Sequence, residues 1–138
     1  MHMLPIILVI IFFIISLLHF YWVFGGKWGL DGSLPKNDEG ENLFMPGPLS
    51  TMVVALGLLG FGLFYATRAG WLELPYTTRW SNIIGWMIPS IFLLRAIGDF
   101  RYCGLTKRVK GTQFAKMDSR YFTPLCLFIA LLGYLSQL

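Results

Sequence analysis

An ionisable pair interrupts the third long apolar stretch of this sequence. Arg95 and Asp99 are four residues apart and share one helix face, and Tyr102 falls on the same face. An intrahelical ion pair is one explanation, but the more favourable order on a helix places the acid first. Asp99 also lies near the expected helix C-terminus, where the helix dipole disfavours an acid. Two hypotheses follow: the pair is structural, or the polar patch serves a ligand or a reaction.

A histidine and three aromatic residues close the first apolar stretch, in the order His19-Phe20-Tyr21-Trp22. This order is typical of the aromatic belt at a membrane–water boundary. A contact between His19 and Asp99 across the bundle would fix the imidazole tautomer and raise its basicity, which makes these two residues the candidate catalytic groups. The predicted ligand-binding residues surround them: Tyr21, Trp22, Trp28, Arg95, Asp99, Arg101 and Tyr102.

The other residue types that could do chemistry predict no metal and no cofactor. His2 lies at the opposite end of the first apolar stretch from His19, and no further histidine completes a site. Cys103 and Cys126 match neither a metal-ligand spacing nor a disulfide framework, so both are predicted to form no disulfide. No nucleic acid is expected as a partner, because no binding fold accompanies the basic residues.

Four apolar runs must position these residues, over about 3–24, 49–69, 81–98 and 122–138. About 20 helical residues cross the hydrocarbon core of a membrane, and backbone groups in lipid must bond within the helix. Hydrophobic residues make up 56% of the chain and charged residues 13%, which leaves too little charge for a soluble surface. The sequence predicts an all-α integral membrane four-helix bundle, with residues 1–138 as a single transmembrane domain.

Lysine and arginine are distributed unevenly between the two sides of such a bundle. The connections 25–48 and 99–121 share one side and hold two plus six, or eight, basic residues, against two in the connection at about 70–80 and its flanks. The positive-inside rule therefore makes 25–48 and 99–121 cytoplasmic and puts both termini outside. The 99–121 connection is either the ordinary topology signal or a segment lying on anionic membrane lipids, which would then be partners.

Small residues form a stripe along the second run, where Gly62, Ala66 and Gly70 recur at four-residue spacing. Such stripes let two helix backbones approach closely. The stripe packs against another span of the same chain, or it joins a second copy or a partner membrane protein. In the third run, Pro89 removes a backbone hydrogen bond and predicts a kink.

Three segments carry a resemblance to a known family. They are His19-x-Tyr21-Trp22 with the following Gly25–Asp31 and Leu34-Pro35, then Arg95–Tyr102, and finally Asp118–Cys126. On these motifs the whole chain resembles a family of small bacterial four-span membrane proteins that is catalogued as a domain of unknown function. The resemblance implies four helices in a bacterial inner membrane and brings no established activity.

Three classes of function fit these residues. The first is the binding of an anionic or amphipathic ligand, such as a lipid headgroup, because the planar guanidinium of arginine suits carboxylates and phosphates. The second is an enzyme for a lipid-soluble substrate, with His19 or Asp99 in proton transfer and Arg95 holding an anionic group. The third is a small subunit or assembly factor of a membrane complex, docked through the small-residue stripe.

Overall fold

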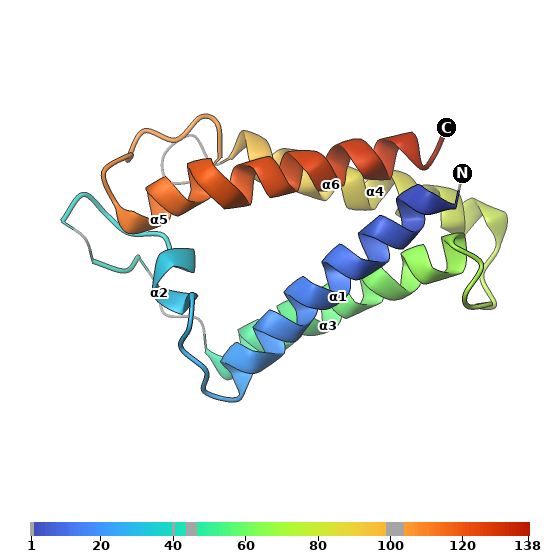
Figure 1. The fold of residues 1–138 in the computed structure, drawn as a ribbon, viewed down its shortest axis with the longest axis horizontal. Helices are drawn as coiled ribbons and strands as arrows, with labels where there is room; N and C mark the ends of the chain where they lie inside the picture. The colour runs from blue at the N-terminus through green and yellow to red at the C-terminus, as the bar shows by residue number, and fades with distance from the viewer. Residues whose placement is uncertain (1, 40, 44–46, 99–103) are drawn as a thin grey trace.

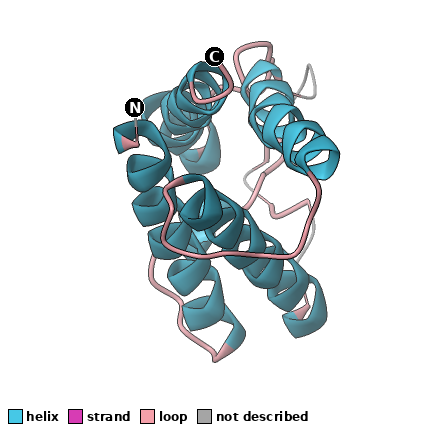
Figure 2. Ribbon diagram, turned by 90° about the vertical axis from the view of Figure 1, so that its right-hand side faces the viewer, coloured by secondary structure: helices cyan, strands magenta, loops and turns pink. Residues whose placement is uncertain are grey.

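Four long helices make up most of the protein. The computed structural model describes residues 2–39, 41–43, 47–98 and 104–138. Its long helices are α1 (Met3–Val23), α3 (Pro48–Arg68), α4 (Thr78–Ile97) and α6 (Thr123–Leu135), and its short ones are α2 (Leu30–Ser33), α5 (Gln113–Met117) and the π-helical turn η1 (Asp118–Phe122). Helices joined by loops account for this described part of the chain (Figure 2). The predicted all-α class is confirmed.

Three of these helices, α1, α3 and α4, are long and apolar enough to cross a membrane. The fourth long helix differs from the expectation that residues 99–121 connect the spans. Helical structure already begins at Gln113 and continues through η1 into α6. It begins there because the Thr112 hydroxyl accepts the Ala115 N–H at 3.1 Å, as an N-cap does, and because Phe114 and Ala115 are buried. The boundaries of the first three helices lie within about three residues of the predicted ones.

The long helices pack as two pairs, α1 with α3 and α4 with α6 (Figure 1). Small residues permit both contacts. A Cβ atom at Gly62 of α3 would lie 3.4 Å from Phe12 Cβ of α1, and one at Gly133 of α6 would lie 2.7 Å from Pro89 Cβ of α4. A buried hydrogen bond from Ser16 Oγ to the Ala55 carbonyl, 2.8 Å long, adds to the first contact.

The small-residue stripe of the second run is therefore largely covered within the chain. Gly62 and Ala66 are buried, and Gly62 contacts Phe12 and Phe13. Gly70 follows α3 with a φ of +80° and is exposed. The contact with α1 accounts for the close approach that the stripe predicted, while association with a second copy stays a prediction.

An aromatic core joins the two pairs. The ring of Phe12 stacks on Tyr65 at 5.8 Å and lies 5.4 Å from the ring of Phe92. Near the chain termini, Arg68 Nη2 donates a 3.0 Å hydrogen bond to the Ser136 carbonyl at the end of α6. The pairs meet at this end and diverge toward the other, where α2 and α5 lie (Figure 1).

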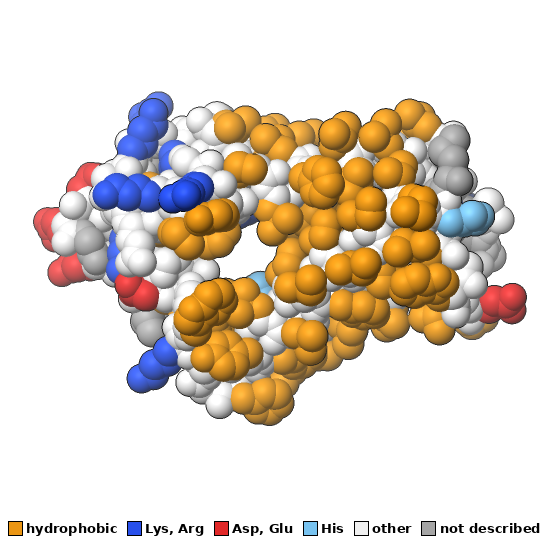
Figure 3. Space-filling view, in the orientation of Figure 1, with side chains coloured by type: hydrophobic (Ala, Val, Ile, Leu, Met, Phe, Trp, Pro, Cys, Tyr) orange, Lys and Arg blue, Asp and Glu red, His pale blue; other side chains and the backbone are white. Residues whose placement is uncertain are grey.

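Apolar side chains also cover the outside of the long helices, whereas charged ones gather at the end that holds α2 and α5 (Figure 3). Exposed large apolar residues lie on every candidate span, among them Ile10, Ile14, Leu17, Val53, Leu56, Ile91 and Leu94. Contiguous exposed apolar surface of this kind suits lipid rather than water. Together with the three candidate spans, it identifies a membrane protein.

Candidate functional site

A cleft of about 590 Å³ lies between the two helix pairs. In the space-filling view the molecule is hollowed there (Figure 3). All four long helices contribute to its wall, which is mostly aliphatic and aromatic, with Phe61 and Phe92 toward the core. Its polar side chains come from His19 and Trp22 of α1, Ser33 of α2 and Arg95 of α4. The cleft is thus apolar along most of its wall and carries one cationic side chain.

The imidazole of His19 is held by its own helix. Its Nδ1 lies 2.8 Å from the Ile15 carbonyl, which only accepts hydrogen bonds, so Nδ1 carries a proton. In the neutral ring, Nε2 is then the nitrogen that can accept a proton or a hydrogen bond. The ring also packs edge-on against Trp22, with 4.9 Å between the centroids. His19 is therefore fixed in tautomer and orientation at the wall of the cleft.

Trp22 ties the end of α1 to the chain that follows. Its Nε1 donates a 2.8 Å hydrogen bond to the carbonyl of Trp28. Trp28 itself is 75% exposed, and Tyr21 is 46% exposed with its ring over Gly26. Tyr21 and Trp28 thus lie beside the cleft wall rather than in it.

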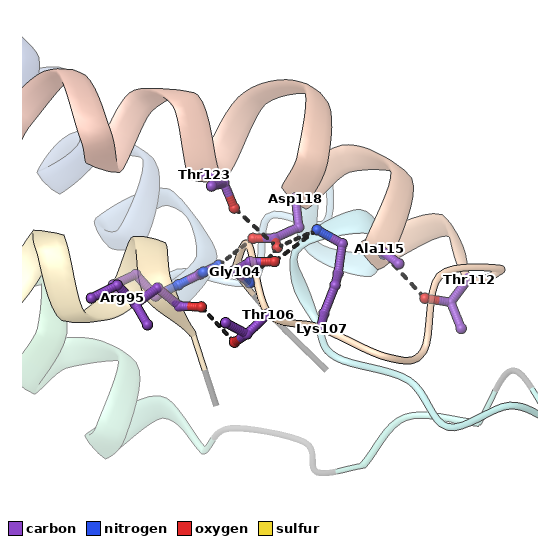
Figure 4. A network of polar contacts seen from close by, with 9 residues as sticks. Arg95, Gly104, Thr106, Lys107, Thr112, Ala115, Asp118 and Thr123 are labelled. Carbon is purple, nitrogen blue, oxygen red and sulfur yellow. Dashed lines mark hydrogen bonds and ion pairs between the residues drawn. The ribbon is translucent and has the colours of Figure 1, made fainter. Parts of the chain in front are cut away.

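A buried carboxylate stands behind Arg95. The side chain of Asp118 is fully buried, and its Oδ1 accepts a 2.7 Å hydrogen bond from Arg95 Nη2. Its Oδ2 accepts from the Gly104 N–H at 2.7 Å, and from Lys107 Nζ and Thr123 Oγ1 at 3.1 Å each (Figure 4). We call Arg95, Lys107, Asp118 and their two neutral partners the Asp118 cluster. Two cationic side chains thus share one carboxylate.

The helix that carries Asp118 is shaped by a proline. Pro124 has no N–H, and its ring clashes with the carbonyl four residues earlier in an α-helix. The chain responds with the π-helical turn η1, in which the Thr123 N–H donates to the Asp118 carbonyl five residues back. Thr123 therefore bonds Asp118 twice, through its backbone and through its hydroxyl. π-Helical turns of this kind are frequent at functional sites.

The loop after α4 brings the other donors to Asp118. It folds back on the helix end, where Leu105 N–H donates to the Ala96 carbonyl at 2.8 Å and Thr106 Oγ1 to the Ile97 carbonyl at 2.6 Å. Gly104 has a φ of +80°, and a Cβ atom there would overlap the backbone of Gly98. Glycine is required at this position by both its conformation and its surroundings.

Asp118 precedes the apolar part of its helix, and its carboxyl is ionised at neutral pH. Burial by itself raises the pKa of this group. The hydrogen bonds from Arg95, Gly104 and Lys107, with the charge of Arg95, outweigh burial and hold the pKa below its ordinary value. The carboxylate thus fixes two cationic side chains that come from α4 and from the following loop.

The structure brings three of the predicted site residues together, since His19, Trp22 and Arg95 line one cleft. Asp99, Arg101, Tyr102 and Cys103 lie outside the described residues. The predicted Arg95–Asp99 pair and His19–Asp99 contact therefore stay predictions. Among the described residues, no group of three or more His, Cys, Asp or Glu side chains could hold a metal ion.

Sequence reasoning missed the pairing of Asp118 with Lys107: it counted Lys107 among the basic residues of the 99–121 connection and named Asp118 within a family motif. The sequence around Asp118 offered one signal that this acid has a cationic partner: Asp118 follows a strongly basic segment and comes six residues before Pro124. Separations of 23 residues from Arg95 and 11 from Lys107 carry no periodicity that would reveal the contact. Only the fold of the connection shows which cations the acid meets.

The fold and the site define a class: a small helical membrane protein with an apolar cleft between two helix pairs and an ion-paired cluster at one end. The chain belongs to the family described as "Protein of unknown function (DUF3995)", whose sequence profile matches residues 12–133. The expected membership of a family of unknown function is confirmed. No curated protein and no solved structure matches the chain.

Proposed function

We propose that this protein binds an amphipathic anion in the cleft, with the apolar part of the ligand between the helix pairs and its acidic group at Arg95. The observation that carries the proposal is the composition of the cleft wall, apolar throughout except for His19, Trp22, Ser33, Cys126 and Arg95. A volume of about 590 Å³ falls within the range of small-molecule pockets, roughly 300–1,000 Å³. An apolar wall with few fixed polar groups is the usual design of such sites.

The charge of the Asp118 cluster supports an anionic rather than a cationic ligand. The Asp118 side chain is 0% exposed, whereas that of Arg95 is 31% exposed and lines the cleft. The guanidinium of Arg95 is therefore accessible from the cleft, and the carboxylate of Asp118 is not. Guanidinium groups also match the geometry of carboxylates and phosphates.

The position of the cluster supports placing this end of the cleft at the cytoplasmic face of a bacterial inner membrane, with both termini outside. Arg108, Lys110, Lys116 and Arg120 are all exposed in the same part of the chain. Exposed basic residues near a membrane face favour its cytoplasmic side and are attracted to anionic lipids there.

A pair of matched ligands tests the proposal. Oleate and oleyl alcohol share one chain, and only oleate carries a charge at neutral pH. Purified protein in a mild detergent should bind oleate more tightly, as measured by calorimetric titration. Arg95→Gln should weaken oleate binding tenfold or more, since a charged hydrogen bond contributes about 1.5–3 kcal/mol, and should leave the alcohol unaffected.

A pair of matched variants tests the place of binding. Gly57 lines the cleft, and a Cβ atom added there meets nothing within 4 Å, so Gly57→Leu fills the cleft without strain. Gly60 has equally open surroundings on the same helix but does not line the cleft. Gly57→Leu should reduce the binding of both ligands, and Gly60→Leu should reduce neither. Unchanged oleate binding in Gly57→Leu would refute the proposed site.

The orientation of His19 favours one alternative, catalysis on a lipid-soluble substrate. With Nδ1 held by the Ile15 carbonyl, Nε2 is available for proton transfer at the wall of the cleft. Extracted membrane lipids incubated with the wild type and with His19→Gln would be compared by mass spectrometry. A product formed by the wild type alone would favour the enzyme; identical lipid profiles would count against it.

A further inference from the structure

A second pocket, of about 300 Å³, lies against the Asp118 cluster and shares no lining residue with the cleft. Its wall consists of Leu105, Lys107, Lys110, Ser119, Thr123, Pro124 and Leu127. It combines two lysines and two hydroxyl groups with three apolar side chains. The two pockets meet the same cluster through different cations, the cleft through Arg95 and the smaller pocket through Lys107.

Lys107 is built into the wall of this pocket rather than free on the surface. It is 7% exposed, and its Nζ donates to the Gly104 carbonyl and to Asp118 Oδ2 at 3.1 Å each. An ammonium group has three donors, and these two contacts use two of them. The Thr123 hydroxyl donates to Asp118, so its proton is also committed. Lys107 therefore keeps one donor for a ligand, and its two hydrogen bonds within the protein hold it in place.

Further donors come from exposed residues of the wall. Lys110 and Ser119 are both exposed, and they add an ammonium group and a hydroxyl group. The wall contains two lysines, and the one nearby carboxylate, Asp118, is shared between Lys107 and Arg95, so the pocket keeps a positive charge. Several donors and a positive charge around a small space suit a tetrahedral oxyanion, which offers acceptors in several directions.

We propose that this second pocket binds the phosphate group of an anionic phospholipid. The polar part of the argument fits any phosphate, free or attached to a lipid. The apolar wall points to the lipid, because Leu105, Pro124 and Leu127 would adjoin acyl chains rather than water, and Leu105 is 65% exposed. The site is separate from the cleft and does not depend on the function proposed for it.

The test is lipid retention by the full-length protein, measured by native mass spectrometry after release from nanodiscs. The nanodiscs contain phosphatidylcholine alone or mixed with phosphatidylglycerol. The informative variant is Lys110→Gln, since Lys110 is exposed and outside the Asp118 cluster, and the matched control is Lys116→Gln, which is exposed and outside the pocket. We expect the wild type and Lys116→Gln to retain phosphatidylglycerol preferentially, and Lys110→Gln to lose about fivefold of that preference.

Adding inorganic phosphate separates the two sources of the ligand. Retention that persists in excess phosphate supports a lipid headgroup; displacement by phosphate supports a site that recognises the phosphate group by itself. Equal retention in Lys110→Gln and Lys116→Gln would overturn the proposal. Lys110 does not line the cleft, so Lys110→Gln should leave oleate binding unchanged, and failure here and failure of the cleft proposal can be told apart.

Discussion

Replacing Asp118 by asparagine should destabilise the protein more than any other single change of one charge. The amide keeps the shape of the side chain but removes the charge that Arg95 and Lys107 share. Breaking a buried ion pair by removing one partner typically costs about 3–5 kcal/mol. Arg95 is 31% exposed and can be partly hydrated, whereas Lys107 is 6% exposed in its side chain and cannot. We therefore expect a loss of about 3 kcal/mol, toward the lower end of that range.

The loss would be measured as the free energy of unfolding in mixed micelles, followed by helical circular dichroism. Asp38→Asn is the matched control, because Asp38 is exposed, and it should change stability by less than about 0.5 kcal/mol. Arg95→Gln should cost less than Asp118→Asn, since the Asp118 carboxylate then keeps its bonds to Lys107, Gly104 and Thr123. A loss below about 1 kcal/mol in Asp118→Asn would refute the assignment of Asp118 as the centre of the cluster.

Three further predictions concern packing, pH and backbone conformation. Gly62→Leu should cost about 1–3 kcal/mol of unfolding free energy by overpacking against α1, whereas Gly60→Leu, which points into open space, should not; equal effects would contradict the packing. Because the pKa of Asp118 is held below its ordinary value, its contribution is complete at neutral pH and is lost as the pH falls below about 4. Unfolding measured against pH should therefore show a steeper acid loss in the wild type than in Asp118→Asn, and parallel curves would exclude this role. Gly104→Ala should lower the melting temperature and weaken the Asp118 cluster. The φ of +80° at Gly104 disfavours alanine, and the added Cβ atom would meet the backbone of Gly98. An unchanged melting temperature would contradict both reasons.

The helices that cross the apolar layer could be predicted from the sequence because one strong rule governs them. Long apolar runs in a chain with little charge must become helices, so the predicted runs 3–24, 49–69 and 81–98 closely match α1, α3 and α4. The packing of Gly62 on α1 follows from an equally local signal, the spacing of small residues. Both signals depend on neighbours in the sequence or on a fixed helical period.

The connection after α4 could not be predicted in the same way. Its helical start at Gln113 depends on the Thr112 cap and on the burial of Phe114. The sequence around these two residues contains no long apolar run that would predict a helix. The π-helical turn arises from Pro124, and no apolar period in the sequence marks it. The cleft itself is a property of how two helix pairs diverge, which no periodicity within a single helix encodes.

The position of Arg95 accounts for a base at this point of the helix, ahead of the acid Asp99 in the sequence. Arg95 lies in the last turn of α4, where the helix dipole favours a cation. Its bond to Asp118 comes from another helix, so the acid-first rule for neighbours on one helix does not apply to it. That arrangement keeps the carboxylate buried at the start of the fourth long helix while the guanidinium reaches the cleft. The guanidinium therefore neutralises Asp118 while part of its surface stays at the cleft wall, where the proposed anionic ligand would meet it.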